Sequence, residues 1–234
     1  MQARAKLTLS LRVTGVREDG YHLLDSEMVT LDLADTLVFA PGDSLTVTGL
    51  GADGPVPAGE DNLVRRALSL LGRTAAVRLD KRIPTGGGLG GGSADAAAVL
   101  RWAGLTDLMA AARLGADVPF CLVGGRARVR GIGELVEPLP FDAVAGAEYT
   151  LLVPPVHVST VEVYRTWDRM GGPTGEHGND LEPAALAVAP ELASWRDRLG
   201  ELTGQVPRLA GSGATWFVAG AYEGPGLRLV RVER

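Results

Sequence analysis

A run of glycines near the middle of the chain constrains the fold more than any other feature of this sequence. Six of the seven residues from 86 to 92 are glycine, and Ser93 and the alanine-rich residues 94–103 follow, ending at Gly104. Such a loop lets backbone amides approach an anion closely, and the helix after it adds its positive dipole end and unpaired N–H groups. The run therefore predicts a phosphate-binding loop with Ser93 as the helix cap. A flexible connector is the alternative, although each glycine costs about 0.5–1 kcal/mol relative to alanine in regular structure.

Two common phosphate loops fit this run poorly. No Gly-Lys-Ser/Thr follows the glycines, as a Walker A loop requires. Gly86, Gly88 and Gly91 do have the Gly-x-Gly-x-x-Gly spacing of a dinucleotide site, but Pro84 separates them from a short strand. No acidic residue ends a second strand about 20 residues later, as such a site also needs. An NAD-linked oxidoreductase stays open as an alternative.

Composition and charge exclude several classes of protein. The chain has 234 residues, 46% hydrophobic and 22% charged, which suits one large or two small globular domains and excludes collagen, coiled coils and disorder. The single cysteine, Cys121, excludes an intramolecular disulfide, and three scattered histidines make no zinc-type set. A net charge of -5 argues against nucleic acid as a partner. Without a long apolar run or a signal peptide, we expect a cytoplasmic protein with no membrane partner.

The pattern of the first 140 residues predicts a mixture of strands and helices. Residues 6–13 alternate between apolar and polar, which predicts a strand whose polar face carries Lys6 and Thr8. Further strands are expected over residues 27–33, 36–39, 45–48, 77–79, 118–123 and 127–129, with a loop over 49–61. Helices are expected from residue 63, behind Asp61 or Asn62 as N-cap, and over 94–103 and 108–114. This irregular order predicts an α+β fold rather than a regular βαβ winding.

Pro138 and Pro140 mark a change in composition, from which we predict a domain boundary near residues 138–147. The two domains would be residues 1–143 and 144–234. In the second, a capping box from Ser159 to Glu162 opens a helix through Trp167. The rest of this domain should contain a second helix over residues 192–202 and strands over 149–153, 206–209, 215–219 and 227–232.

Four blocks of sequence together resemble a known enzyme superfamily. They are residues 5–9 with Gly20-Tyr21-His22 downstream, the glycine loop with its helix start (84–98), residues 114–120 and residues 210–214; residues 179–183 form a weaker fifth block. Their order and spacing resemble the galactokinase, homoserine kinase, mevalonate kinase and phosphomevalonate kinase (GHMP) superfamily. Within it, the chain is most similar to the family of 4-diphosphocytidyl-2-C-methyl-D-erythritol kinases, over nearly its whole length. The resemblance implies a two-domain α+β fold with an N-terminal ATP-binding domain and the substrate in the cleft between domains.

The resemblance also implies a reaction and a catalytic pair. The γ-phosphate of ATP, carried with Mg2+, would pass to the 2-hydroxyl of the cytidyl-linked methylerythritol in non-mevalonate isoprenoid biosynthesis. Lys6 and Asp117 match the family's catalytic pair, and Asp117 lies in an apolar stretch where a carboxylate is costly unless paired or functional. Asp117 would accept or orient the hydroxyl proton and Lys6 would neutralise charge on the transferred group. Phosphoryl transfer depends more on positioning and electrostatics than on a strong base.

Binding residues follow from the same resemblance. Tyr21 and His22 would hold the cytosine end of a small-molecule substrate that carries a cytidyl diphosphate group, with Tyr164 as a second aromatic or, alternatively, a core residue. Thr8, where the family usually has asparagine, would contact the substrate. The turn of Gly211, Ser212 and Gly213 would approach the substrate phosphates.

The expected ATP site consists of the glycine loop and one residue before it in the chain. Its members are Asn62, Pro84, Gly86, Gly87, Gly88, Leu89, Gly90, Gly91, Gly92 and Ser93. Asn62 could instead be only an N-cap. Ser93 would contact a phosphate or the magnesium ion carried by ATP. Asp95, in the first turn of the helix, could favour the helix dipole, bind metal or do neither.

The sequence is also compatible with two further functions. One is a related small-alcohol kinase of the homoserine or mevalonate type. The other is a degenerate ATP-binding regulatory protein, because the chain is shorter than most members between residues 100 and 107 and after Tyr222, and because of Thr8. The oligomeric state is also open, either a monomer or a weak homodimer.

Overall fold

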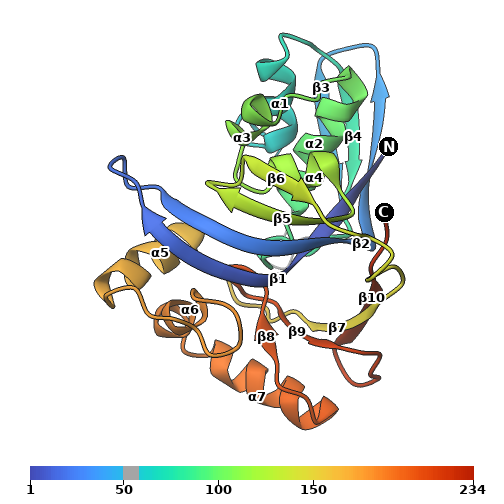
Figure 1. The fold of residues 1–234 in the computed structure, drawn as a ribbon. Helices are drawn as coiled ribbons and strands as arrows, with labels where there is room; N and C mark the ends of the chain where they lie inside the picture. The colour runs from blue at the N-terminus through green and yellow to red at the C-terminus, as the bar shows by residue number, and fades with distance from the viewer. Residues whose placement is uncertain (50–57) are drawn as a thin grey trace.

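The computed structural model describes residues 1–49 and 58–234, so most of the loop expected over residues 49–61 lies outside the described residues. Within them the chain forms two sheets, with helices packed against each (Figure 1). The elements are, in order, β1 (Gln2–Val16), β2 (His22–Ala40), β3 (Ser44–Thr48), α1 (Leu63–Leu70), β4 (Ala76–Asp80), α2 (Gly91–Ala103), α3 (Leu108–Ala112), α4 (Val118–Val123), β5 (Arg126–Gly131), β6 (Leu135–Pro138), β7 (Glu148–Leu152), α5 (Thr160–Arg169), α6 (Glu182–Val188), α7 (Leu192–Thr203), β8 (Arg208–Leu209), β9 (Trp216–Ala219) and β10 (Leu227–Arg231). None of these helices is long and apolar enough to cross a membrane.

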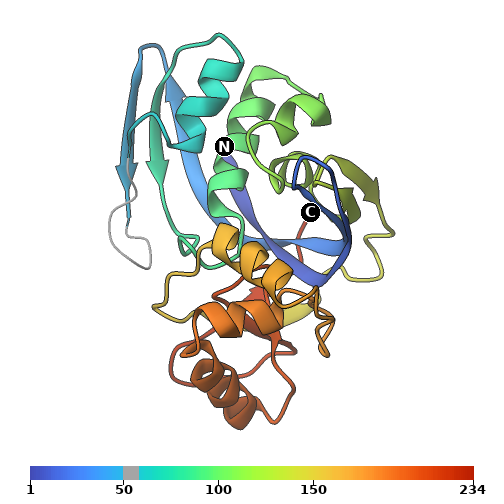
Figure 2. The same ribbon diagram turned by 90° about the vertical axis from the view of Figure 1, so that its left-hand side faces the viewer.

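The first sheet is organised around the long strand β2. Its order is β3-β4-β2-β5-β6, and β1 pairs with β2 along most of its length. The edge of β2 opposite β1 is shared, because residues 36–40 pair with β4 and residues 24–29 pair with β5. All of these pairs are antiparallel except β3 with β4. Pairing of β2 with β5 stops at Leu24, so the tip of the β1–β2 hairpin extends beyond the sheet toward α5 (Figures 1 and 2).

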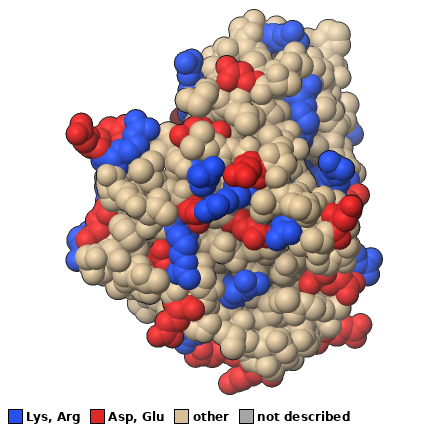
Figure 3. All heavy atoms as spheres, in the orientation of Figure 1, with Lys and Arg blue, Asp and Glu red and all other residues tan. Residues whose placement is uncertain are grey.

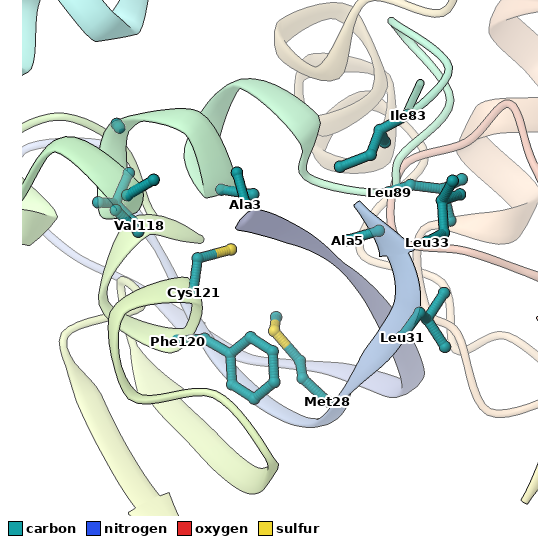
Figure 4. Close-up of a cluster of buried hydrophobic side chains, with 14 of the residues drawn as sticks. Ala3, Ala5, Met28, Leu31, Leu33, Ile83, Leu89, Val118, Phe120 and Cys121 are labelled. Carbon is teal, nitrogen blue, oxygen red and sulfur yellow. The ribbon is translucent and has the colours of Figure 1, made fainter. Parts of the chain in front are cut away.

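Helix α2 lies close to this sheet because its buried face is made of small side chains. Ala94 and residues 96–98 are buried, as are Ala3 and Ala5 on β1. Figure 4 shows the neighbouring core, where Phe120 and Met28 fill the space between α4 and the sheet. Small residues on both elements permit close approach of helix and strand. This packing holds the first turn of α2 against β1.

The second sheet has the order β10-β7-β9-β8 and carries α5, α6 and α7 at the other end of the molecule (Figure 2). Its core surrounds the fully buried Trp216 and also includes Leu11, which comes from β1. In the other direction, Phe217 and Val230 of the second sheet belong to the first core. The β1–β2 hairpin therefore links the two halves, and the boundary at residues 143 and 144 stays a prediction.

The strand predicted over residues 118–123 is wrong, because this segment is helix α4. Asp117 occupies its N-cap position, a proline follows in the first turn, and Gly124 ends it. Proline is well accommodated in the first turn of a helix, where its missing N–H is not needed. A short apolar run cannot be assigned to strand or helix from periodicity alone.

The helix cap predicted at Ser93 is also wrong. Helix α2 begins at Gly91, and Gly90 is its N-cap in a left-handed conformation (φ 70°, ψ 25°) with no side-chain hydrogen bond. Glycine adopts this conformation without steric penalty, so the helix starts before the first residue that could cap it with a side chain. Ser93 therefore lies within the first turn. The stop at Gly104 is confirmed.

Other boundaries differ in smaller ways. The strands expected over residues 27–33 and 36–39 are one strand, because the intervening Asp35 is buried in an ion pair rather than exposed in a turn. The helix expected over 108–114 ends at Ala112, and β6 and α6 were not predicted. The caps at Asn62 and Ser159 are confirmed by hydrogen bonds from the backbone N–H groups of Val64 and Glu162. On the face drawn in Figure 3, basic and acidic side chains are interspersed.

Candidate active site

The glycine loop lines a hollow of about 310 Å³ at the start of α2. Leu63 and residues 84–93 form its walls, so Ser93 and every loop residue of the expected ATP site lie there. No side chain caps the first turn of α2, which leaves its N–H groups available to a ligand. The N-terminus of a helix with free N–H groups favours an anion. This hollow can therefore hold phosphate.

Lys6 and Asp117 meet beside the glycine loop. The Nζ atom of Lys6 lies 3.3 Å from Oδ2 of Asp117 and donates a hydrogen bond to Oγ1 of Thr8 at 3.0 Å. The Lys6 side chain is only 4% exposed, whereas that of Asp117 is 30% exposed. The backbone N–H of Lys6 also donates to the carbonyl of Leu89 at 3.0 Å. A buried ammonium and a more accessible carboxylate thus border the phosphate hollow.

Local structure explains how the three polar groups converge. Lys6 and Thr8 are two residues apart on β1, so their side chains emerge from the same face of the sheet. Asp117 precedes α4, which packs against α2 and β1. A Cβ atom at Gly90 would lie 2.8 Å from Cγ of Lys6, so the lysine stem occupies the space that a side chain would fill. The absence of side chains in the loop is what admits Lys6.

The turn at residues 210–213 closes the loop from the second half of the chain. The N–H of Thr215 donates to the carbonyl of Gly87 at 3.3 Å, and a Cβ atom at Gly211 would lie 3.4 Å from Nζ of Lys6. Asn179 is buried and donates from Nδ2 to the carbonyls of Leu209 and Gly211, at 2.9 and 2.7 Å. Sequence reasoning noted the block around Asn179 but assigned it no role. Asn179 fixes the shape of this turn.

Replacing Gly88 by alanine should disrupt the contact between the glycine loop and the turn at residues 210–213. A Cβ atom there would lie 2.3 Å from the carbonyl oxygen of Ala210 and 2.8 Å from that of Gly213, and backbone atoms cannot move aside cheaply. We expect a lower melting temperature and weaker ATP binding, measured by thermal unfolding and calorimetry. Gly104→Ala is the matched control, because Gly104 also has a positive φ (78°) but its Cβ atom would meet nothing within 4 Å. Equal effects of the two variants would contradict the contact.

A larger cavity of about 870 Å³ adjoins Asp117, the partner of Lys6. Tyr21 and His22 at the tip of the β1–β2 hairpin line it together with Tyr164 of α5 and with Ala116, the residue before Asp117. The rings of His22 and Tyr164 are 4.6 Å apart and tilted by 36°. Tyr21 is 59% exposed, and burial raises the pKa of Tyr164 so that its phenol stays neutral. The structure thus brings together the three aromatic residues that the sequence analysis singled out.

Asp168 orients the His22 ring, and sequence reasoning missed it. Its Oδ1 atom lies 2.8 Å from Nε2 of His22, while Trp167 contacts the ring edge-on at 5.6 Å between centroids. A carboxylate partner selects the forms of histidine that carry a proton on Nε2. The only sequence signal was helical spacing, since Tyr164, Trp167 and Asp168 lie on neighbouring turns of α5.

The remaining predicted residues lie in different surroundings. Asn62 caps α1, and its neighbour Leu63 lines the phosphate hollow. The hydroxyl of Ser212 lies 2.8 Å from that of Thr160, which lines the large cavity, so Ser212 adjoins this cavity. A Cβ atom at Gly213, the last residue of the turn, would point toward Leu209 and Leu192.

A buried ion triad lies beneath the phosphate hollow. Lys81 pairs with Asp35 and, at 2.6 Å, with Asp95, and the three side chains are at most 5% exposed. Asp35 also accepts hydrogen bonds from the backbone N–H groups of Arg82 and Ile83. Burial raises the pKa of Asp95 to about 7 despite the Lys81 charge, and no hydrogen-bond partner is found for its Oδ1 atom among the described residues. The Asp95 carboxylate therefore faces Lys81, and the triad ties both ends of the glycine loop to β2.

Comparisons with known proteins agree with this arrangement. Residues 62–125 match the model of the GHMP kinases N terminal domain. A 4-diphosphocytidyl-2-C-methyl-D-erythritol kinase of Paracoccus denitrificans is 43% identical, with 92% of this chain and 84% of the relative covered. One of Cereibacter sphaeroides is 41% identical, with 95% and 90% covered. The chain belongs to the 4-diphosphocytidyl-2-C-methyl-D-erythritol kinase family.

Solved structures agree with this family. A crystal structure of 4-(cytidine 5'-diphospho)-2C-methyl-D-erythritol kinase superposes with a TM-score of 0.72 at 35% identity, and 93% of this kinase and 88% of that chain are covered. The mevalonate kinase of Methanococcus jannaschii has a TM-score of 0.57 at 11% identity, with 100% and 98% covered, and shares the fold. The α+β GHMP kinase fold expected from the sequence is confirmed.

Proposed function

We propose that this kinase transfers the γ-phosphoryl group of ATP to the 2-hydroxyl of 4-diphosphocytidyl-2-C-methyl-D-erythritol. One observation carries the proposal: the Lys6–Asp117 pair lies where the glycine loop meets the aromatic-lined cavity. Family membership supports the substrate, because the relatives named above carry it in their names. The reaction belongs to non-mevalonate isoprenoid biosynthesis, and we propose a cytoplasmic location for it.

The mechanism uses the two charged groups in different ways. The Asp117 carboxylate accepts the proton of the 2-hydroxyl as its oxygen forms a bond to the γ-phosphorus. The bond from that phosphorus to the bridging oxygen breaks, and its electron pair leaves with ADP. Lys6 faces Asp117 at 3.3 Å and neutralises negative charge on the transferred group. Because the transition state is loose, the glycine loop and Lys6 act mainly by positioning and electrostatics.

ATP would occupy the hollow of the glycine loop, with Asn62 and Leu63 at the adenine end. Magnesium fits this site only as an ion that arrives with the phosphates. Among residues 1–49 and 58–234, no group of three His, Cys, Asp or Glu side chains could hold a metal. Mg2+ usually keeps several waters and binds through phosphates and one or two protein ligands, and Ser93 offers one oxygen in the hollow. When bound beside Ser93, the ion would supply positive charge that offsets the negative charge of the phosphates.

The direct test is turnover with a panel of acceptors. The purified protein is incubated with labelled ATP and magnesium and, separately, with cytidyl-methylerythritol, homoserine, mevalonate and galactose. We expect a phosphorylated product from the cytidyl substrate alone. Turnover of homoserine or mevalonate instead would identify a related small-alcohol kinase. ATP binding without any product would identify a degenerate regulatory protein.

Removing the aromatic side chains that are proposed to stack on the base should impair turnover of the cytidyl substrate. Tyr21→Ala and His22→Ala each remove a ring from the cavity. Stacking of a base on an aromatic side chain contributes about 1–3 kcal/mol, so we expect kcat/KM for this substrate to fall about 5- to 150-fold. KM for ATP should not change. His157→Ala, at an exposed histidine outside the cavity, is the control. Unchanged turnover by a variant that combines Tyr21→Ala with His22→Ala would contradict the assignment.

The division of labour between the two halves is also proposed. Residues 1–143 would form the ATP-binding domain, since they contain the glycine loop, Lys6 and Asp117. Residues 144–234 would supply Tyr164 and the turn around Ser212 to the acceptor. The protein would act as a monomer or weak homodimer, which analytical ultracentrifugation distinguishes.

A further inference from the structure

The acceptor substrate brings a diphosphate into the cavity, and the charges of that diphosphate need partners. In the substrate, the diphosphate joins the cytidine to the erythritol that carries the reacting hydroxyl. With the base at Tyr21 and His22 and the hydroxyl at Asp117, the diphosphate must lie in the stretch of cavity between them. Burying phosphate charge without compensating cations is costly. The walls of this stretch should therefore contain unpaired positive groups.

Most charged side chains of the cavity wall already have partners. Arg17 pairs with Asp19 at 2.7 Å, and Arg165 pairs with Glu162 at 2.8 Å. The Glu134 carboxylate turns back to accept the N–H of Ile132, and Asp168 holds His22. The two arginines are neutralised by their carboxylate partners and Glu134 keeps its negative charge, so these groups supply no free positive charge to a ligand.

Arg66 and Arg113 differ from these side chains in their position and in their contacts. Both line the large cavity, and both also line a neighbouring hollow of about 320 Å³, so they stand together on the wall that separates the two. Neither guanidinium group has a hydrogen bond or ion pair within the part of the chain that the structure describes. Arg113 lies four positions before Asp117, on the segment that leads into the catalytic residue. The phosphate hollow at the glycine loop contains neither arginine.

From this juxtaposition we infer that Arg66 and Arg113 form a clamp that binds the diphosphate of the acceptor substrate. The inference rests on the proposed function and adds the residues that distinguish a nucleoside-diphosphate-linked alcohol from a free alcohol. Arginine suits this role because its planar fork binds phosphate oxygens in pairs. The clamp acts in binding and takes no part in the proton transfer at Asp117.

The test compares ligands with and without phosphate. Arg66→Met and Arg113→Met keep the length of the stem while removing the guanidinium group. Titration calorimetry measures dissociation constants for cytidine, cytidine 5'-diphosphate and ATP. We expect each variant to bind cytidine 5'-diphosphate about 10- to 100-fold more weakly, with cytidine and ATP unchanged. Arg113→Lys should restore part of the loss, and Arg78→Met, at an exposed arginine on β4 outside both hollows, should have no effect.

Two outcomes would overturn the inference. Equal weakening of cytidine and cytidine 5'-diphosphate would mean that the arginines only support the shape of the cavity. Weakening confined to ATP would assign them to the nucleotide donor. In kinetic assays, the variants should raise KM for the cytidyl substrate more than they lower kcat. Failure of the wild type to phosphorylate that substrate would overturn the proposed function, whereas normal turnover with unaffected variants would overturn the clamp alone.

Discussion

Asp117→Asn lowers kcat by about 10²- to 10⁴-fold in our expectation, the range that a positioned proton acceptor contributes. Asparagine has nearly the same shape but cannot accept the proton of the 2-hydroxyl. Binding should change much less than kcat, because the glycine loop and the aromatic end of the cavity stay intact. Single-turnover kinetics with labelled ATP separates the chemical step from product release.

Controls distinguish loss of chemistry from loss of structure. Asp142→Asn changes an exposed carboxyl outside the cavities and should leave kcat unchanged. Lys6→Met should also lower kcat severely, since it removes the ammonium that faces both Asp117 and the glycine loop. If Asp117→Asn retained full kcat while Lys6→Met did not, Asp117 would serve only to orient Lys6. Full activity in both variants would contradict the proposed mechanism.

The second large effect concerns stability, and it comes from Lys81. Lys81→Met leaves Asp35 and Asp95 buried without a counter-ion. Breaking a buried ion pair from one side destabilises proteins by about 3–5 kcal/mol. For a chain of this length, each kcal/mol lowers the melting temperature by about 2–4 °C. We therefore expect a marked fall in the unfolding temperature, measured by calorimetry in the absence of ligand.

Two further variants test whether charge is the cause. Lys81→Met combined with Asp95→Asn leaves one fewer uncompensated carboxylate, so the double variant should be more stable than Lys81→Met alone. Arg130→Met breaks an exposed pair with Glu137 and should change stability by no more than about 1 kcal/mol. Equal melting temperatures for the Lys81 and Arg130 variants would show that the buried triad does not stabilise the fold.

Several features could be predicted from sequence because each depends on contacts within a few residues. They are the glycine loop, the caps at Asn62 and Ser159, and the alternating strand that carries Lys6. The incorrect predictions arose where local sequence was ambiguous or where the deciding contact lay far away in the chain. The apolar run after Asp117 has no period that separates helix from strand, and the left-handed start of α2 at Gly90 needed no side-chain cap. Asp35 looked like a strand breaker because its partner, Lys81, lies 46 positions away.

The sequence by itself determined which local motifs exist and in what order, and those motifs were specific enough to identify the family. The tertiary structure alone decided which side chains meet. His22 and Asp168 are 146 positions apart, and Arg66 and Arg113 come from different helical segments, yet each pair shares one site. Hydrogen bonds and ion pairs act over a few ångströms, whereas the sequence records only separation along the chain. Residues far apart in the sequence become neighbours because α2 packs on β1 and because the β1–β2 hairpin extends to α5.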